Sequence, residues 1–177
     1  MSGSPMTHDS PSASTIQLRQ AQVDDTRQIL AFVRELAEYE KLAHEAVADE
    51  ATLAAQLFGE RPAAEVIIAE VDGQPAGFAL FFHNFSTFLG KRGLYLEDLF
   101  VRPQFRGMGL GQRLMAHLAR IAVERDCGRF EWSVLDWNTP AVDFYRQLGA
   151  APLDGWTVQR MTGDALTALA MRDTAGN

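Results

Sequence analysis

Cysteine is nearly absent from this sequence, since Cys127 is the only one among 177 residues. A single cysteine excludes a disulfide framework and a thiolate metal site. No apolar run approaches the roughly 18 residues that cross a bilayer, and the N-terminus lacks the basic patch and apolar stretch of a secretory signal. His44, His83 and His117 lack the spacing of metal ligands. These absences predict a soluble, cytosolic protein with no metal site and no membrane partner.

Positive charge is also scarce. Lysine and arginine number 16 against 23 aspartates and glutamates, which gives a net charge of -7. Nucleic-acid binding usually needs a basic face that displaces counterions, and here the arginines are interspersed with carboxylates. The sequence therefore predicts no nucleic-acid partner. Two interpretations of the acidic surface stay open: it attracts cationic substrates, or it only keeps the protein soluble.

The composition is that of a globular protein, with 47% hydrophobic and 22% charged residues. A chain of this length suits one domain with one core. Residues 1–14 are rich in serine and proline and have no apolar periodicity. We therefore predict a disordered N-terminal tail over residues 1–14 and a single domain over residues 15–177.

Apolar periodicity and turn signals predict the order of helices and strands. Strands are predicted at residues 16–19, 66–71, 76–82, 93–101, 130–135 and 156–161. Helices are predicted after the capping residues Asp24, Asp49 and Asn138, after a glycine-rich turn at residues 106–111, and over residues 164–171. Asp72-Gly73 is a strong signal for a tight hairpin. This order predicts a mixed α/β sheet with helices on both faces.

The glycine-rich turn is Arg106-Gly107-Met108-Gly109-Leu110-Gly111, where a predicted strand passes into a predicted helix. Glycines there let backbone N–H groups approach a ligand closely. The helix N-terminus adds partial positive charge, so the turn is suited to phosphate oxygens. Arg102 and Arg106 offer charge-assisted contacts.

Three families of phosphate-binding turn can be compared with this one. A P-loop needs Gly-Lys-Ser/Thr at the helix start, whereas this chain has Gly111-Gln112-Arg113. A dinucleotide fingerprint needs G-x-G-x-x-G, and the spacing here is G-x-G-x-G. The acyl-coenzyme A pattern R/Q-x-x-G-x-G/A is matched by Arg106, Gly109 and Gly111. A turn in which the glycines have only a structural role is the remaining alternative.

Four stretches carry a resemblance to a known family: ELAEYEKL at 35–42, GFALFFHNFSTFLGKRGLYLEDLFV at 77–101, RGMGLG at 106–111 and LDWNTPAVDFYRQLGA at 135–150. With them the chain resembles the GNAT superfamily of N-acetyltransferases, and within it the diamine (spermidine/spermine) acetyltransferase branch, from about Ile16 to Trp156. The resemblance implies a mixed, mostly antiparallel sheet with splayed central strands. It also implies acetyl-CoA as co-substrate and a homodimer.

The resemblance implies catalytic roles for Glu97 and Tyr145. Glu97 would accept the proton of the amine, and its setting inside an apolar strand would raise the pKa of a carboxylate. Strand alternation sends Glu97 and its neighbour Asp98 to opposite sides. Tyr145 would lie beside the coenzyme sulfur and act as general acid, since a phenol stays protonated at pH 7.

The same resemblance implies two sets of binding residues. The coenzyme would contact the backbone of Leu99, Phe100 and Val101, the turn Arg106, Gly107, Met108, Gly109, Leu110, Gly111 and Gln112, and the helix residues Asn138, Thr139, Pro140, Ala141 and Tyr145. The amine would contact Tyr39, Glu40, Glu97, Glu131, Trp132, Ser133 and Asp154. A solvated helix-end charge is the alternative for Glu40.

The predicted function is therefore acetyl transfer from acetyl-CoA to a primary amine of a small di- or polyamine or lysine-like molecule, by direct attack in a ternary complex. One alternative is an enzyme that acetylates protein or peptide amino groups. The loop at residues 85–91 looks long enough to help close the site, which favours a small acceptor. The other alternative is a coenzyme A-binding regulatory module without catalysis. The presence of both Glu97 and Tyr145 argues against that module.

Overall fold

The computed structural model describes residues 14–174, so the predicted tail at residues 1–14 lies, apart from Ser14, outside the described residues. The chain divides into two compact units, Met1–Ser133 and Val134–Asn177. Each unit is described by itself below. The single domain over residues 15–177 stays a prediction.

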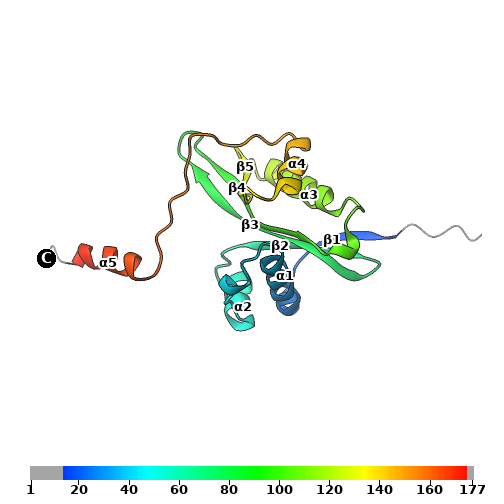
Figure 1. Ribbon diagram of the computed structural model, residues 1–177, viewed down its shortest axis with the longest axis horizontal. Coiled ribbons are helices and arrows are strands. Elements are labelled where there is room, and N and C mark those ends of the chain that lie inside the picture. Colours follow the sequence, from blue (N-terminus) through cyan, green and yellow to red (C-terminus); the bar gives the residue numbers. More distant parts are fainter. Residues whose placement is uncertain (1–13, 175–177) are drawn as a thin grey trace, which may run out of the picture. The chain divides into compact units, whose positions relative to one another are not determined.

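The first unit contains one five-stranded sheet in the order β1-β2-β3-β4-β5 (Figure 1). The strands are β1 (Ile16–Gln20), β2 (Glu65–Val71), β3 (Gln74–Ser86), β4 (Lys91–Val101) and β5 (Phe130–Trp132). The first three pairings are antiparallel, and β4 pairs with β5 in parallel. The prediction of a mixed, mostly antiparallel sheet is confirmed.

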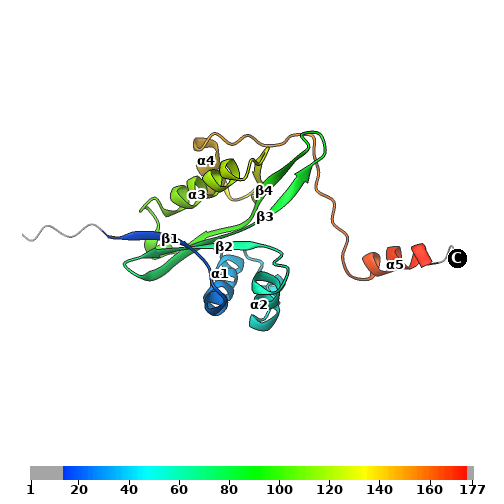
Figure 2. The same cartoon turned by 180° about the vertical axis from the view of Figure 1, so that it is seen from behind.

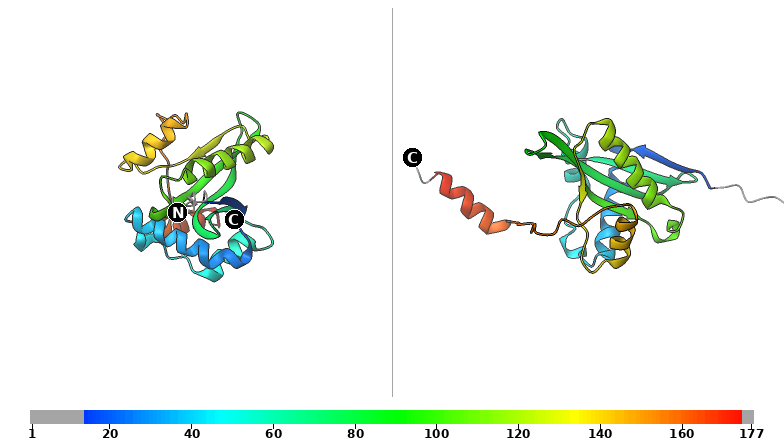
Figure 3. Two further views of the ribbon diagram at one scale, coloured as in Figure 1. Left: turned by 90° about the vertical axis from the view of Figure 1, so that its right-hand side faces the viewer. Right: turned by 90° about the horizontal axis from the view of Figure 1, so that it is seen from above.

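Helices of the first unit lie on both faces of this sheet, as predicted. Figures 1 and 2 show α1 (Thr26–Tyr39) and α2 (Glu50–Phe58) on one face and α3 (Leu110–Glu124) on the other. The left view of Figure 3 shows the same layers from the end of the sheet. The described part of the unit, from Ser14 on, also contains three short 3-10 helices: η1 (Val23–Asp25), η2 (Ala43–Glu45) and η3 (Pro103–Phe105).

Local signals position several of these elements. The Asp49 carboxylate accepts a hydrogen bond from the Thr52 backbone N–H at 2.7 Å and caps α2, as predicted. The predicted cap at Asp24 is wrong, because the residue before α1 is Asp25. The Asp25 carboxylate forms an ion pair with Arg19 at 2.7 Å instead of capping the helix.

The predicted hairpin is confirmed, since Asp72 and Gly73 join β2 to β3 with φ values of 50° and 76°. Both residues therefore adopt the left-handed conformation that a tight hairpin turn requires.

Aromatic packing fixes α1 against the sheet. The Phe32 ring on α1 stacks on Phe78 of β3, with centroids 5.3 Å apart, and lies 6.5 Å from the ring of Phe100 on β4. On the opposite face, Leu110, Leu114 and the other apolar residues of α3 are buried. The sheet is thus covered on both faces around β3 and β4, which holds the C-terminal end of β4 in place.

The second unit contains α4 (Thr139–Gln147) and α5 (Gly163–Thr174). The Asn138 side chain accepts a hydrogen bond from the Ala141 backbone N–H at 3.4 Å, so the predicted cap is confirmed. The strand predicted at residues 156–161 is wrong, because this segment is no strand in the described chain. Trp156 and Val158 are 80% and 83% exposed, and β-prone alternation forms a strand only where another strand pairs with it.

β5 is shorter than predicted and ends at Trp132 instead of residue 135. Between residues 14 and 174, no helix is both long and apolar enough to cross a bilayer.

Candidate functional site

The two halves of β4 differ in their neighbours. From Leu94 to Leu96 the strand pairs with β3 on one edge and with β5 on the other. From Glu97 to Val101 it continues along β3, but the described part of β5 has already ended. The central strands therefore splay apart after Leu96, as predicted. The backbone of the second half has one edge left for hydrogen bonds to an extended ligand.

A β-bulge lies at the point where the strands part. Leu80 of β3 opposes Asp98, whereas the next residue, Phe81, opposes Leu96, so Glu97 is the extra residue on β4. The alternation of sides predicted for Glu97 and Asp98 assumed a regular strand, and the bulge interrupts that regularity. Bulges of this kind often re-aim side chains next to active sites.

Asp98 is the half-buried carboxylate at this bulge. Burial raises its pKa to about 6, and the negative charges of Glu97 and Glu40 add to the effect. Glu40 caps the C-terminal end of α1, and its own pKa is raised by burial. Two elements far apart in the sequence thus bring the charges of Glu97 and Glu40 within electrostatic range of Asp98.

The sequence predicted an apolar setting for the Glu97 carboxylate. That setting is wrong, because Glu97 is exposed, whereas its neighbour Asp98 is half-buried. The only signal for Asp98 in the sequence is that a second carboxylate follows Glu97 inside an apolar strand. The half-burial of Glu40 also argues against a fully solvated helix-end charge.

The glycine-rich turn has the conformation that its glycines allow. Gly107 and Gly109 have φ values of 81° and 78°, and Gly109 immediately precedes α3. The position where a Cβ would stand on either glycine is open, with no atom within 4 Å. The first N–H groups of a helix have no partner within that helix. The turn therefore presents helix-end N–H donors next to open space, an arrangement that suits the oxygens of a diphosphate.

Arg106 of the glycine-rich turn contacts Tyr39 at the end of α1. Tyr39 is the last residue of α1, and the Arg106 guanidinium carbon lies 5.0 Å from the centroid of its ring. The sequence assigned Tyr39 to the amine and Arg106 to the coenzyme. The contact therefore joins one residue of the predicted amine-binding set to one residue of the predicted coenzyme-binding set.

Glu131, Trp132 and Ser133, predicted to bind the amine, contact other side chains of the first unit. The Glu131 carboxylate lies 2.9 Å from Nε of Arg129 and accepts a hydrogen bond from the Asn84 amide at 3.0 Å. Ser133 shares a hydrogen bond of 2.8 Å with the Tyr95 hydroxyl. The charge of Glu131 is thus matched by Arg129 within the first unit.

The rings of Trp132 and Phe130 lie 5.0 Å apart, so this short strand presents two aromatic side chains in contact.

The remaining predicted site residues belong to the second unit. Asn138, Thr139, Pro140 and Ala141 form the start of α4, and Tyr145 lies on the same helix. The rings of Tyr145 and its neighbour Phe144 lie 5.2 Å apart, and both side chains are half-buried. Asp154 is exposed in the segment after α4.

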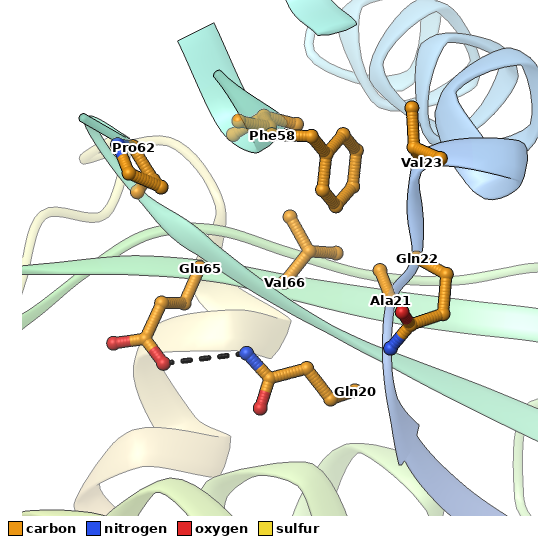
Figure 4. Close-up of a pocket in the computed structure, with 10 residues that line it drawn as sticks. Gln20, Ala21, Gln22, Val23, Phe58, Pro62, Glu65 and Val66 are labelled. Atoms are coloured by element: carbon orange, nitrogen blue, oxygen red, sulfur yellow. Dashed lines mark hydrogen bonds between the residues drawn. The ribbon is translucent and has the colours of Figure 1, made fainter. Parts of the chain in front are cut away.

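A cavity of about 430 Å³ lies elsewhere in the first unit, between the end of α2 and the start of β2 (Figure 4). It is lined by Phe58, Pro62 and Val23, with the Gln20 amide hydrogen-bonded to Glu65 at 3.4 Å. None of the predicted site residues lines it. Among residues 14–174, no group of three or more His, Cys, Asp or Glu side chains is arranged to hold a metal ion.

Comparison with known proteins agrees with the geometry of the turn and the splayed strands. The model of the acetyltransferase (GNAT) family matches residues 28–150. This chain belongs to the GNAT family of acetyltransferases. The predicted family and N-acetyltransferase activity are thereby confirmed, and GNAT acetyltransferases use acetyl-CoA.

Similar GNAT proteins cover most of the chain. The thialysine N-epsilon-acetyltransferase of Sus scrofa is 39% identical over 168 residues, covering 89% of this chain and 98% of that protein. The L-ornithine N5-acetyltransferase NATA1 of Arabidopsis thaliana is 33% identical, covering 86% and 87% respectively.

Among solved structures, an integron cassette protein from the mobile metagenome of V. cholerae has a TM-score of 0.75 and 30% identity. The match covers 88% of this chain and 97% of that one. The likeness in fold therefore extends over most of this chain.

Proposed function

We propose that this GNAT protein acetylates a primary amine of a small lysine-like amino acid or a di- or polyamine. The observation that carries the proposal is the group of Glu40, Glu97 and Asp98 around the end of β4. Burial raises the pKa of Asp98, and the like charges of Glu97 and Glu40 raise it further. A cationic amine would relieve that repulsion. The relatives named for thialysine and ornithine act on amines of this class.

Acetyl-CoA fits the geometry next to these carboxylates. The turn at residues 106–112 offers helix-end N–H groups for the diphosphate, with open space above Gly107 and Gly109. The free edge of Leu99, Phe100 and Val101 offers backbone groups to the pantetheine arm. We assign Asn138, Thr139, Pro140 and Ala141 to the same ligand on the family resemblance.

Acetyl transfer requires the amine to lose a proton and the thiolate to gain one. We assign the first task to the Glu97–Asp98 pair, since an ionised carboxylate beside the amine can accept its proton. The amine nitrogen then attacks the thioester carbonyl carbon, and the C–S bond breaks. We assign the proton for the leaving thiolate to the Tyr145 hydroxyl.

A panel assay tests the choice of acceptor. Release of free coenzyme A is measured with thialysine, ornithine, lysine, putrescine and spermidine, and with a lysine-containing peptide. The proposal expects the highest kcat/KM with one of the small amines. A preference for the peptide would favour a protein acetyltransferase. Coenzyme A binding without transfer to any amine or peptide would favour the non-catalytic module.

The assignment of Tyr145 has its own test. Tyr145→Phe removes only the hydroxyl, and turnover should fall about 10²-fold or more while acetyl-CoA still binds. Phe144→Leu is the matched control, because it changes the neighbouring ring and leaves the hydroxyl. Near-normal turnover of folded Tyr145→Phe, where chemistry limits the rate, would remove this residue from the mechanism.

We also propose a cytosolic homodimer that needs no metal. The family resemblance supports the dimer, and the single cysteine agrees with a reducing compartment. Light scattering on the purified protein tests the homodimer, and a monomer at assay concentrations would contradict it. Activity after dialysis against a chelator tests the absence of a metal requirement, and activity lost on chelation would contradict that absence.

A further inference from the structure

Two arginines flank η3, the short helix that joins β4 to the glycine-rich turn, and both reach α1. Arg102 is firmly held. Its guanidinium contacts the Glu35 carboxylate at 2.7 and 2.9 Å, donates to the Pro75 carbonyl at 2.9 Å and lies 4.7 Å from the centre of the Phe32 ring. This set of contacts fixes the start of η3 against the middle of α1.

Arg106, at the other end of η3, is held by weaker contacts. Its Nε donates to the Val101 carbonyl at 3.1 Å, and its guanidinium carbon lies 5.0 Å from the ring of Tyr39 and 6.0 Å from that of Phe100. Within residues 14–174, no carboxylate forms an ion pair with it. An exposed cation–π contact is worth about 0.5–1 kcal/mol, so a bound anion can change how well Arg106 is ordered.

Arg106 lies between two regions to which we assign different ligands. On one side it begins the turn that we assign to the coenzyme diphosphate. On the other side it covers Tyr39, the neighbour of Glu40, whose charge acts on Asp98. Ordering the Tyr39 ring therefore also orders the end of α1 that carries Glu40.

We propose that Arg106 is a positioning residue that couples the coenzyme site to the amine site. A diphosphate in the turn restricts the guanidinium, the restricted guanidinium holds Tyr39, and the end of α1 is then ordered before the amine arrives. Since the first ligand supplies part of this ordering, the second binds more tightly. This inference rests on the proposed function for the identity of the amine, but not for the ordering of α1.

Calorimetry measures the coupling directly. Coenzyme A lacks the acetyl group, so ornithine binding can be measured with and without saturating coenzyme A while no reaction occurs. The wild-type protein should bind ornithine about two- to fivefold more tightly in the presence of coenzyme A, the factor that one exposed cation–π contact supplies. In Arg106→Gln the factor should fall to about one.

Amide hydrogen exchange tests the ordering without any acceptor. The Glu40 and Leu42 N–H groups donate to the carbonyls of Leu36 and Ala37 at 2.9 and 2.8 Å. Coenzyme A should slow the exchange of these two amides in the wild type. In Arg106→Gln the same amides should exchange faster than in the wild type. Amides of the preceding turns of α1, which Arg102 fixes, should not change.

Arg113→Gln is the matched control, since Arg113 is an exposed arginine in the first turn of α3. Its loss removes the same charge near the turn and should leave exchange at Glu40 and Leu42 unchanged. If Arg106→Gln only weakens coenzyme A binding, and neither exchange nor the coupling factor changes, the proposal is overturned. If ornithine does not bind at all, the exchange result still decides the role of Arg106, and the fault lies in the proposed acceptor.

Discussion

The first and second halves of β4 belong to one strand but differ in pairing, register and burial. In the first half, Leu94 and Leu96 are 0% and 2% exposed, and both edges of the strand are paired. In the second half, one edge lacks a strand partner in the described chain, a bulge interrupts the register, and carboxylates replace leucines. The difference shows that full pairing favours buried apolar side chains in the first half, whereas the second half has a backbone edge and the carboxylates to which we assign ligand binding.

Truncation in the paired half should have the largest effect, and on stability alone. Leu94→Ala removes a fully buried side chain and should lower the free energy of unfolding by about 2–5 kcal/mol. Chemical denaturation measures this loss. The turnover of the molecules that remain folded should stay near the wild-type value, and a large fall in turnover would contradict the division of β4. Leu94→Val, with a smaller loss, serves if the alanine variant fails to fold.

Removal of the Glu97 charge at the bulge should have the reverse outcome, a loss of turnover with little change in stability. Glu97→Gln keeps the shape but not the base, so kcat should fall about 10²-fold or more. Part of the rate should return at high pH, where more of the amine is already neutral. Glu70→Gln is the control, because Glu70 is a strand carboxylate that pairs with Arg19 on β1. Steady-state rates of Glu97→Gln equal to those of this control would exclude Glu97 as the base.

Asp98 should affect stability and activity in opposite directions. Its folded-state pKa of about 6 lies above the ordinary value of 3.8, so folding favours its protonated form. The stability that this provides is complete below pH 3.8 and is lost as pH rises through 6. Asp98→Asn should therefore raise the free energy of unfolding by about 1–2 kcal/mol at pH 8 and change it little at pH 4.

The activity of Asp98→Asn provides the second part of this test. In the wild type, kcat/KM should fall about tenfold from pH 7 to pH 5, because one unit below its pKa about a tenth of Asp98 is ionised. The variant should be slower at pH 7 and should lack this step. If kcat/KM of the variant still falls about tenfold from pH 7 to pH 5, another group causes the pH dependence.

Substitution in the turn that follows β4 should have the smallest effect. Gly109→Val should weaken coenzyme A binding at least about tenfold, roughly 1.4 kcal/mol, as measured by calorimetry. Its φ of 78° strains any side chain, so the control needs equal strain elsewhere. Gly73→Val, at φ 76° in the β2–β3 hairpin, provides it. Equal affinities in the two folded variants would contradict the assignment of the turn.

Signals within a few residues were sufficient for much of the fold. The Asp49 and Asn138 caps, the Asp72-Gly73 hairpin and the glycines of the turn act through neighbouring backbone groups, and all were predicted correctly. Resemblance to the GNAT family then supplied the splayed central strands. The strand predicted at residues 156–161 failed because its formation depends on a distant partner strand.

The sequence by itself therefore determined the order of most elements, the glycine-rich turn before α3 and the presence of two adjacent carboxylates in an apolar strand. Only the tertiary structure decided which of the two carboxylates is half-buried, because the bulge at Glu97 depends on the register between β3 and β4. It alone also brought Glu40 into range of Asp98 and placed Arg106 over Tyr39. These contacts join residues 58 and 67 positions apart in the sequence, and packing of α1 on the sheet creates them. No local sequence pattern encodes such contacts.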